Sequence, residues 1–226
     1  MILKMTPKCV LFDLDGTLVD TAPDLGLAAN LVREEQDLAP LPLSDYRPYA
    51  SCGARGLLKV ALGISMEDPA YPQRKDRFLV HYRANLSRNS RLFPGIDEML
   101  TALEHAGIRW GVVTNKVSEL SEPLMRDLGL TPRSACLVSG DSTPKPKPAP
   151  EPLLLASRLV GVAARDCLYV GDDERDILSG RAAHMRTAAA GWGYMGDKPD
   201  PRSWSADVIL DTPAELAQLL ELRRAA

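Results

Sequence analysis

The stretch CVLFDLDGTLVD, residues 9–20, decides how the rest of the chain is interpreted. Its first four residues are apolar and are bounded by polar ones, which is typical of a strand buried on both faces of a parallel sheet. Because residues i and i+2 of extended backbone point the same way, Asp13 and Asp15 are predicted to present two carboxylates together. They would lie at the carboxyl end of the strand, the edge where open α/β sheets bind ligands.

Two close carboxylates repel each other unless a cation or a proton lies between them. Hard oxygen ligands in such an arrangement favour Mg²⁺. Gly16 would let the chain turn sharply, and the amides of that turn could face an anion. For Asp-x-Asp alone, an ordinary surface turn would be the better interpretation. The full string after a buried strand favours an acidic site that binds a metal and an anion.

Outward from this stretch, short apolar runs alternate with helical patterns along most of the chain. The alternation predicts a doubly wound α/β domain around a parallel sheet. The predicted strands after residues 9–12 are 108–113, 135–138, 167–170, 186–190 and 208–210. The predicted helices between and after them are 95–106, 117–128, 149–160, 174–184 and 213–223.

One long interval breaks this rhythm, because it contains helical patterns and no convincing strand. The patterns lie near 22–36, 53–62 and 71–89 and are joined by proline-containing connections. We therefore predict a Rossmann-like core of residues 1–21 and 92–226, with an all-helical domain of residues 22–91 inserted after the first strand.

Composition excludes several classes of protein. The 226 residues suffice for one domain and a smaller one, and the content of 45% hydrophobic and 25% charged residues is that of a globular chain. The 27 basic and 30 acidic residues leave a net charge of −3, unlike the basic excess of a generic nucleic-acid binder. We expect no nucleic-acid partner.

Cysteine usage and hydropathy indicate the compartment. The four cysteines contain no C-x-x-C pair and only three histidines accompany them, so structural zinc is not expected. No apolar leader opens the chain, and it has no run of about 18 apolar residues. The sequence therefore predicts a cytoplasmic protein without a membrane partner.

Three further motifs follow later predicted strands. Thr114 and Asn115 end the strand at 108–113, Lys147 stands in a Lys-Pro-Ala-Pro run ahead of a helix, and residues 171–176 read GDDERD. Together with Asp-x-Asp-Gly-Thr, these motifs resemble the haloacid dehalogenase superfamily, in the order in which its phosphatases carry them. Four motifs in the right order are far more specific than any one of them.

The resemblance implies a role for each residue. Asp13 would attack phosphorus to form an aspartyl-phosphate, and Asp15 would serve as general acid and then general base. Mg²⁺ would be held by Asp13, the backbone of Asp15, and Asp172. The phosphate would be bound by Thr114, Asn115 and Lys147. Asp173 and Asp176 would orient Lys147 and the metal's waters.

Each residue taken alone also has an ordinary structural interpretation. Thr114 could be a strand-end hydroxyl, and Asp172 and Asp173 could cap the following helix. Lys145 competes with Lys147, and the Lys-Pro-x-Pro register favours Lys147.

The helical insert resembles the C1 cap of the family, which closes over the phosphate and chooses the leaving group. The predicted specificity loop spans residues 50–56 and contains Gly53, Ala54 and Arg55. Arg55 could hold a substrate carboxylate or hydroxyl. It could equally be an exposed residue in the first turn of a helix.

The resemblance implies a phosphatase that acts on a small phosphorylated metabolite, as a monomer or weak homodimer. The phosphoglycolate phosphatase group, with 2-phosphoglycolate as substrate, is the leading interpretation. The stretch 191–208 is more similar to N-acetylmuramic acid 6-phosphate phosphatases. A mutase of the β-phosphoglucomutase type and an inactive phosphate-binding regulator are further alternatives. The spacing G-x-G-x-x-G at 191–196 is not a dinucleotide site, because a proline-rich stretch rather than a helix follows it.

Overall fold

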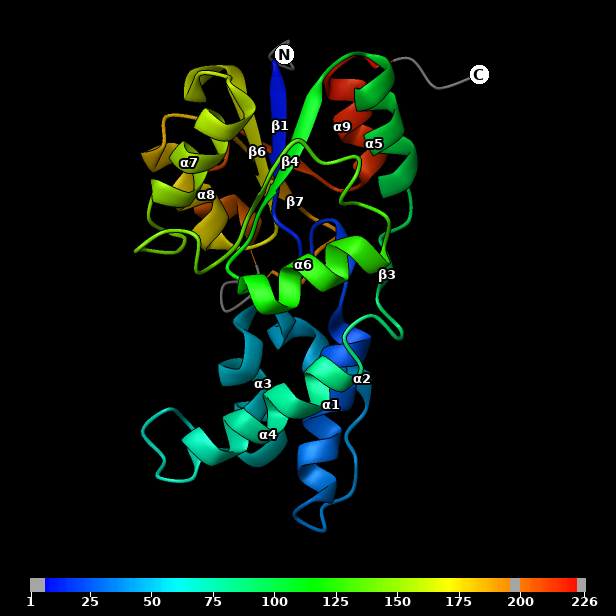
Figure 1. The fold of residues 1–226 in the computed structure, drawn as a ribbon, viewed down its shortest axis with the longest axis vertical. Coiled ribbons are helices and arrows are strands. Elements are labelled where there is room, and N and C mark those ends of the chain that lie inside the picture. The colour runs from blue at the N-terminus through cyan, green and yellow to red at the C-terminus, as the bar shows by residue number, and fades with distance from the viewer. Residues whose placement is uncertain (1–6, 196–199, 223–226) are drawn as a thin grey trace.

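A computed structural model describes residues 7–195 and 200–222, and within them six strands form one parallel sheet (Figure 1). The sheet confirms the predicted doubly wound α/β class. Its order is β5 (Leu137–Val138), β4 (Arg109–Val113), β1 (Cys9–Phe12), β6 (Cys167–Gly171), β7 (Arg186–Ala190) and β8 (Val208–Leu210).

Strand β1 lies near the middle of this sheet, between β4 and β6. Its four residues are fully buried and alternate between two hydrophobic cores. Val10 and Phe12 belong to the larger core, and Cys9 and Leu11 to the smaller one on the opposite face. Burial on both faces explains why the strand is uniformly apolar.

Helices cover both faces of the sheet (Figure 1). On one face, α7 (Glu151–Val160) packs over the smaller core, and α8 (Glu174–Ala182) lies against β6 and β7. On the other, α5 (Ile96–His105) packs beside α9 (Pro213–Leu219), and α6 (Ser118–Asp127) lies toward the carboxyl end of the strands. The helix predicted at 213–223 begins at Pro213 as expected but ends earlier, at Leu219. Residue 223 lies outside the described residues.

The helical insert lies beyond the carboxyl ends of the strands (Figure 1). It leaves and rejoins the sheet domain through an antiparallel pair, β2 (Val19–Asp20) and β3 (Arg91–Leu92). Its helices are α1 (Ala22–Glu34), α2 (Leu43–Tyr46), a 3₁₀ helix (Arg47–Cys52), α3 (Gly53–Leu62) and α4 (Tyr71–Ala84). The division at residues 21/22 and 91/92 stays a prediction.

Helix α4 ends five residues before the predicted boundary at 89, and a distant carboxylate explains this. Asp24, buried in the first turn of α1, accepts hydrogen bonds from the backbone N–H groups of Asn89 (2.9 Å) and Ser90 (2.8 Å). It also accepts one from the Ser90 hydroxyl at 2.7 Å. These amides bond to a side chain instead of extending the helix, so the chain turns back toward β3.

The predicted specificity loop at 50–56 is also more regular than expected. Its first half is the end of the 3₁₀ helix, and its second half is the first turn of α3, which begins at Gly53. In the described ranges 7–195 and 200–222, no helix has the length and apolar character needed to cross a bilayer.

Candidate active site

The carboxyl edge of the sheet gathers the predicted polar residues from three neighbouring strands. Asp13 directly follows β1 and donates its backbone N–H to the Val170 carbonyl at 2.9 Å. Thr114 directly follows β4 and donates its N–H to the Val138 carbonyl at the same distance. Asp172 directly follows β6. Parallel pairing therefore brings together side chains that are far apart in sequence.

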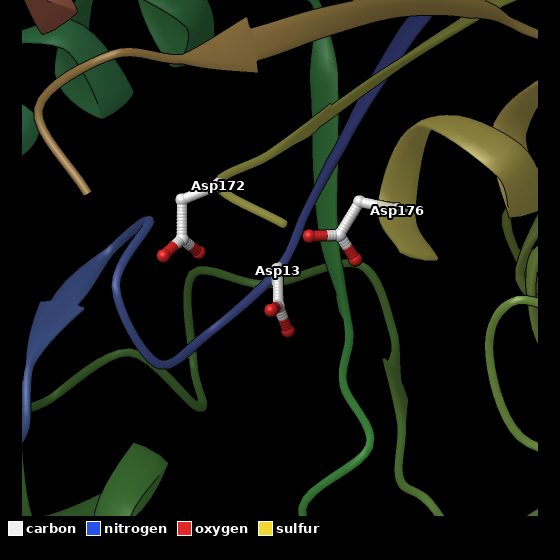
Figure 2. A group of neighbouring side chains, drawn as sticks. All are labelled: Asp13, Asp172 and Asp176. Carbon is white, nitrogen blue, oxygen red and sulfur yellow. The ribbon is translucent and has the colours of Figure 1, made fainter. Parts of the chain in front are cut away.

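Three carboxylates form a cluster at this edge: Asp13, Asp172 and, from α8, Asp176 (Figure 2). One oxygen of each lies within 4.8 Å of the others, and all three residues are buried. Burial raises the pKa of Asp13 to about 6 against the opposing effect of the Lys147 ammonium. Burial, with Asp13 and Asp176 nearby, also raises the pKa of Asp172 well above its usual range. The cluster therefore holds more negative charge than its protein surroundings balance.

Asp172 is held in place from three sides. Its carboxylate accepts hydrogen bonds from the hydroxyl of Thr17 (2.9 Å), the backbone N–H of Tyr194 (2.8 Å) and the hydroxyl of Ser51 in the insert (3.2 Å). The backbone at Gly16 and at Gly193 lies so close to Asp172 that neither position has room for a Cβ. A Cβ on Gly16, whose φ is +86°, would lie 2.1 Å from an Asp172 oxygen, and a Cβ on Gly193 would lie 2.2 Å from the Asp172 Cβ.

Lys147 is buried between two of the acids. Its Nζ lies 2.9 Å from Asp13 Oδ1 and 2.7 Å from Asp176 Oδ1, and it donates to the Tyr169 hydroxyl at 2.8 Å. Burial alone would lower the pKa of Lys147, but the two carboxylates outweigh burial and raise it. Lys145, the competing candidate, is exposed. Of the two lysines, Lys147 is therefore the one placed against the acidic cluster.

The remaining residues predicted at this edge position other side chains. The side-chain amide of Asn115 exchanges two 2.9 Å hydrogen bonds with the backbone of Lys147. Asp173 caps the N-terminus of α8 and is gripped by the Arg175 guanidinium, which lowers its pKa in spite of burial. Asp176 completes that capping box by accepting from the Asp173 N–H at 3.1 Å.

Asp15 faces a second buried lysine that the sequence analysis missed. Lys116 Nζ lies 2.9 and 3.1 Å from the two Asp15 oxygens and 2.8 Å from the hydroxyl of Tyr82 on α4. The Thr21 hydroxyl donates to Asp15 at 2.6 Å. Lys116 follows Thr114 and Asn115 at the end of β4, so the strand-edge argument applied to those two residues could have identified it. Nothing local indicated Tyr82.

The loop after β7 packs against the site instead of binding a dinucleotide. Trp192 Nε1 donates to the Thr17 carbonyl at 2.9 Å, and the Tyr194 hydroxyl donates to Asp20 at 2.7 Å. Arg47 of the insert grips the same Asp20 carboxylate with two hydrogen bonds of 3.0 and 2.9 Å. The loop thus ties the sheet edge to the point where the insert begins; Gly196, the last glycine of the pattern, lies outside the described residues.

A cavity of about 390 Å³ lies between the sheet edge and the insert, within the range of small-molecule sites. Asp13, Asp15, Thr114 and Lys147 line it from the sheet side. Gly53 and Ala54 line it from the insert. Arg55 is exposed and lies outside that lining. The other insert side chains that face the cavity include Leu25, Lys75, Phe78, Leu79 and Tyr82.

The donor set fits a hard divalent cation. Oxygens of carboxylates are the ligands that such ions prefer. A cation would offset both causes that raise the pKa values of Asp13 and Asp172, which are burial first and the neighbouring carboxylates second. The Asp15 side chain is held by Lys116 and Thr21 and does not join the three carboxylates of the cluster. The arrangement places two carboxylates, those of Asp13 and Asp15, and the buried ammonium of Lys147 against one cavity.

Comparison with known proteins agrees with this geometry. A family model described as haloacid dehalogenase-like hydrolase matches residues 10–190. The chain is 45% identical to a phosphoglycolate phosphatase of Xanthomonas campestris, over 93% of this chain and 95% of that one. It is 43% identical to an N-acetylmuramic acid 6-phosphate phosphatase of Pseudomonas aeruginosa, over 96% of both. A crystal structure of a predicted phosphoglycolate phosphatase from Haemophilus somnus superimposes with a TM-score of 0.82 at 27% identity, covering 97% of this chain and 99% of that one.

Proposed function

Because the chain belongs to the haloacid dehalogenase-like hydrolase family, we propose that it hydrolyses a small phosphomonoester through an aspartyl-phosphate on Asp13. The chain is a phosphatase: curated relatives of that kind are 40–45% identical over 93–96% of its length. One observation carries the mechanism. Asp13 and Asp15 follow β1 side by side, each paired with its own buried lysine.

Asp13 is the nucleophile in this proposal. Its carboxylate lines the cavity and lies next to the Lys147 ammonium, which can neutralise the phosphoryl oxygens as the carboxylate approaches them. Attack by a carboxylate requires the ionised form, and Lys147 favours that form against the effect of burial. Thr114 lines the same wall of the cavity and is the second proposed phosphate contact, with Asn115 beside it.

Asp15 is the general acid and base. It gives a proton to the leaving oxygen as the aspartyl-phosphate forms, and then takes a proton from the water that hydrolyses this intermediate. Its position on the same cavity wall as Asp13 supports that role, because both carboxylates can reach one bound phosphate ester.

Mg²⁺ is the proposed cofactor, held by Asp13, Asp172 and the backbone carbonyl of Asp15. When bound, the ion would polarise a phosphate oxygen and offset the negative charge of the acidic cluster. Asp173 and Asp176 are proposed to act indirectly. Asp176 positions the Lys147 ammonium at 2.7 Å, and Asp173 anchors the start of α8, which carries Asp176.

The leading substrate is 2-phosphoglycolate. Several curated relatives carry the name phosphoglycolate phosphatase, including proteins from Xanthomonas campestris and Xylella fastidiosa at 42–45% identity. The insert is proposed to select the leaving group through Gly53 and Ala54, which line the cavity. Arg55 would have to turn inward to contribute, because its side chain is exposed.

A second candidate substrate, N-acetylmuramic acid 6-phosphate, is favoured by the apolar part of the cavity. Apolar side chains also line the cavity. Leu25, Phe78 and Leu79 come from the insert, Leu120 comes from α6, and Val117 directly precedes α6. The leaving group of 2-phosphoglycolate is small and acidic and would contact few of these side chains. N-acetylmuramic acid is bulkier, and the methyl groups of its acetyl and lactyl substituents could pack against these side chains.

One comparison separates these substrates. We would measure kcat/KM for 2-phosphoglycolate, N-acetylmuramic acid 6-phosphate and β-glucose 1-phosphate on one preparation with Mg²⁺, following free phosphate. A mutase would convert β-glucose 1-phosphate to its isomer without net release of phosphate. Absence of turnover of p-nitrophenyl phosphate, under conditions where a related phosphatase is active, would refute the catalytic proposal and favour a regulator. Cytoplasmic location and a monomer or weak homodimer stay predictions.

A further inference from the structure

Lys116 is a buried cation with no part in the mechanism above. Its ammonium has three partners, the two Asp15 oxygens at 2.9 and 3.1 Å and the Tyr82 hydroxyl at 2.8 Å. An ammonium has three donor hydrogens, so these partners can use all of them. Only 7% of the side chain is exposed. Lys116 is therefore placed to hold Asp15 in one orientation rather than to wait for a substrate group.

Tyr82 reaches Lys116 from the other side of the cavity. It lies on α4 of the insert, whereas Lys116 and Asp15 belong to the sheet edge. Its ring also lies beside the ammonium, with Nζ 4.7 Å from the ring centroid, the geometry of a cation–π contact. The Tyr82 side chain is buried and packs on Phe78 of the same helix. A rigid helix thus brings one hydroxyl of the insert to the lysine that grips Asp15.

We propose that Lys116 and Tyr82 are positioning residues that aim the Asp15 carboxyl at the leaving oxygen only while the insert covers the site. The inference rests on the proposed phosphatase mechanism and adds to it a dependence of proton transfer on the insert. The hydroxyl of Thr21, the residue between β2 and α1, donates to an Asp15 oxygen at 2.6 Å. Without Tyr82, Lys116 would keep its ion pair with Asp15 but lose the contact that fixes the ammonium, so the lysine and the carboxyl could turn together away from the ester.

The step that depends on this geometry is the first one. An Asp13 oxygen forms a bond to phosphorus while the bond from phosphorus to the ester oxygen breaks, and its electron pair stays on that oxygen. The proton of the Asp15 carboxyl moves to the same oxygen, so an alcohol leaves and Asp15 becomes a carboxylate. Lys116 then faces the charge that has developed on Asp15. A good leaving group needs little of this help, whereas a poor one needs all of it.

Two aryl esters of nearly equal size test the proposal. Phenyl phosphate has a poor leaving group and p-nitrophenyl phosphate a good one, and neither carries a carboxylate that Lys116 could bind. For K116M we expect kcat/KM to fall about 100-fold with phenyl phosphate and less than about tenfold with p-nitrophenyl phosphate. For Y82F, which removes one hydroxyl and keeps the ring, we expect about a tenfold fall that is again confined to phenyl phosphate. K116R should restore part of the loss, because it keeps the charge.

Matched controls separate positioning from general damage. K145M changes an exposed lysine and Y49F an exposed tyrosine of the insert, and both should leave the two kcat/KM values unchanged. D15N should show the same preference for the good leaving group. Adding K116M to D15N should lower kcat/KM for phenyl phosphate little further, because both changes act on the same group. Equal losses on both esters in Y82F and K116M would overturn the proposal, as would a change in KM alone. The proposed function would still stand in that case, provided that the wild-type chain turns over both esters; if it turned over neither, both proposals would fail.

Discussion

The sheet edge and the helical insert form opposite walls of the same cavity, but the two walls are lined by different kinds of side chain. On the sheet side the wall is made of buried charges, such as Asp13 and Lys147, held by hydrogen bonds at fixed positions. On the insert side it is largely apolar, with Phe78 and Leu79 on α4. Charged groups that act on a phosphate need rigid support, whereas a surface that accommodates a leaving group needs shape. We therefore expect the sheet side to carry most of the chemistry, with Tyr82 as the contribution of the insert, and the apolar residues of the insert to select the leaving group.

The largest effect should come from the sheet side. D13N replaces the proposed nucleophile with an amide of the same shape, and we expect phosphate release from p-nitrophenyl phosphate to fall by about 10⁴-fold or more. The fold should survive, so near-native thermal unfolding should accompany the loss. D76N, at an exposed position on α4, should keep full activity. An active D13N would show that another group attacks phosphorus.

The lysine between the acids should come next. K147M leaves Asp13 and Asp176 without the ammonium at 2.9 and 2.7 Å, so activity should fall about 10²- to 10³-fold. Because an uncompensated buried charge is costly, the free energy of unfolding should also fall by about 3 kcal/mol. Steady-state kinetics and urea unfolding measure the two effects. K145M removes an exposed lysine two residues away, and a comparable loss there would reverse the choice between the two lysines.

The pH dependence of metal binding tests the charge on that wall. Asp13 has a raised pKa of about 6 in the folded protein, so the metal-free folded state binds more protons than the unfolded chain between about pH 4 and pH 6. The stability of the metal-free protein should therefore decrease as the pH rises through this window, and Asp172 should add to the effect. Saturating Mg²⁺ should raise Tm by about 5 °C at pH 7.5 and by less at pH 5, where protons compete.

Calorimetry measures Tm with EDTA and with Mg²⁺ at both pH values, and the difference between the two is the Mg²⁺-dependent rise in Tm. D13N should lose most of the Mg²⁺-dependent gain, and D76N should keep it. The same gain at pH 5 and pH 7.5 would mean that the buried carboxylates are not where the ion binds.

The smallest effect is expected on the insert side. L79A enlarges the apolar wall without touching a charged group, so it should change the ratio of kcat/KM between N-acetylmuramic acid 6-phosphate and 2-phosphoglycolate by about tenfold. Turnover of p-nitrophenyl phosphate should change little. V80A alters the next residue, which is 47% exposed, and should leave the ratio unchanged. If L79A instead abolished turnover of every ester, the division between chemistry and selection would be wrong.

The fold could be predicted largely because each buried strand carries its own signal. The strands at 186–190 and 208–210 have the predicted bounds, as does α3 at 53–62. The family resemblance, the α/β class and the phosphatase activity that it implied are confirmed. What was missed is short or depends on distant residues. Strands β2 and β3 have two residues each, too few for any periodicity. The predicted end of the helix at 89 was wrong, because α4 ends at Ala84 and the amides of Asn89 and Ser90 bond to Asp24 of another helix.

The residues of the site also fall into those that the sequence could place and those that it could not. Asp13, Thr114 and Asp172 could be placed together because each directly follows a strand of one parallel sheet. The same reasoning, carried one residue past Asn115, would have included Lys116. The roles assigned to these residues stay predictions. Ser51, by contrast, could not have been placed, because its contact with Asp172 joins residues 121 positions apart across the cavity.

The sequence by itself determined that Asp13, Thr114 and Asp172 lie at one edge of the sheet, because each directly follows a parallel strand and the carboxyl ends of such strands share that edge. Only the tertiary structure decided which lysine serves which aspartate: Lys147 lies against Asp13, and Lys116 lies against Asp15. It also decided that Tyr82 of the insert completes the second pair. The physical reason is how far apart in the sequence the interacting residues lie. Strand pairing and burial follow from the pattern of neighbouring residues, whereas a hydrogen bond between the insert and the sheet edge depends on how the two pack.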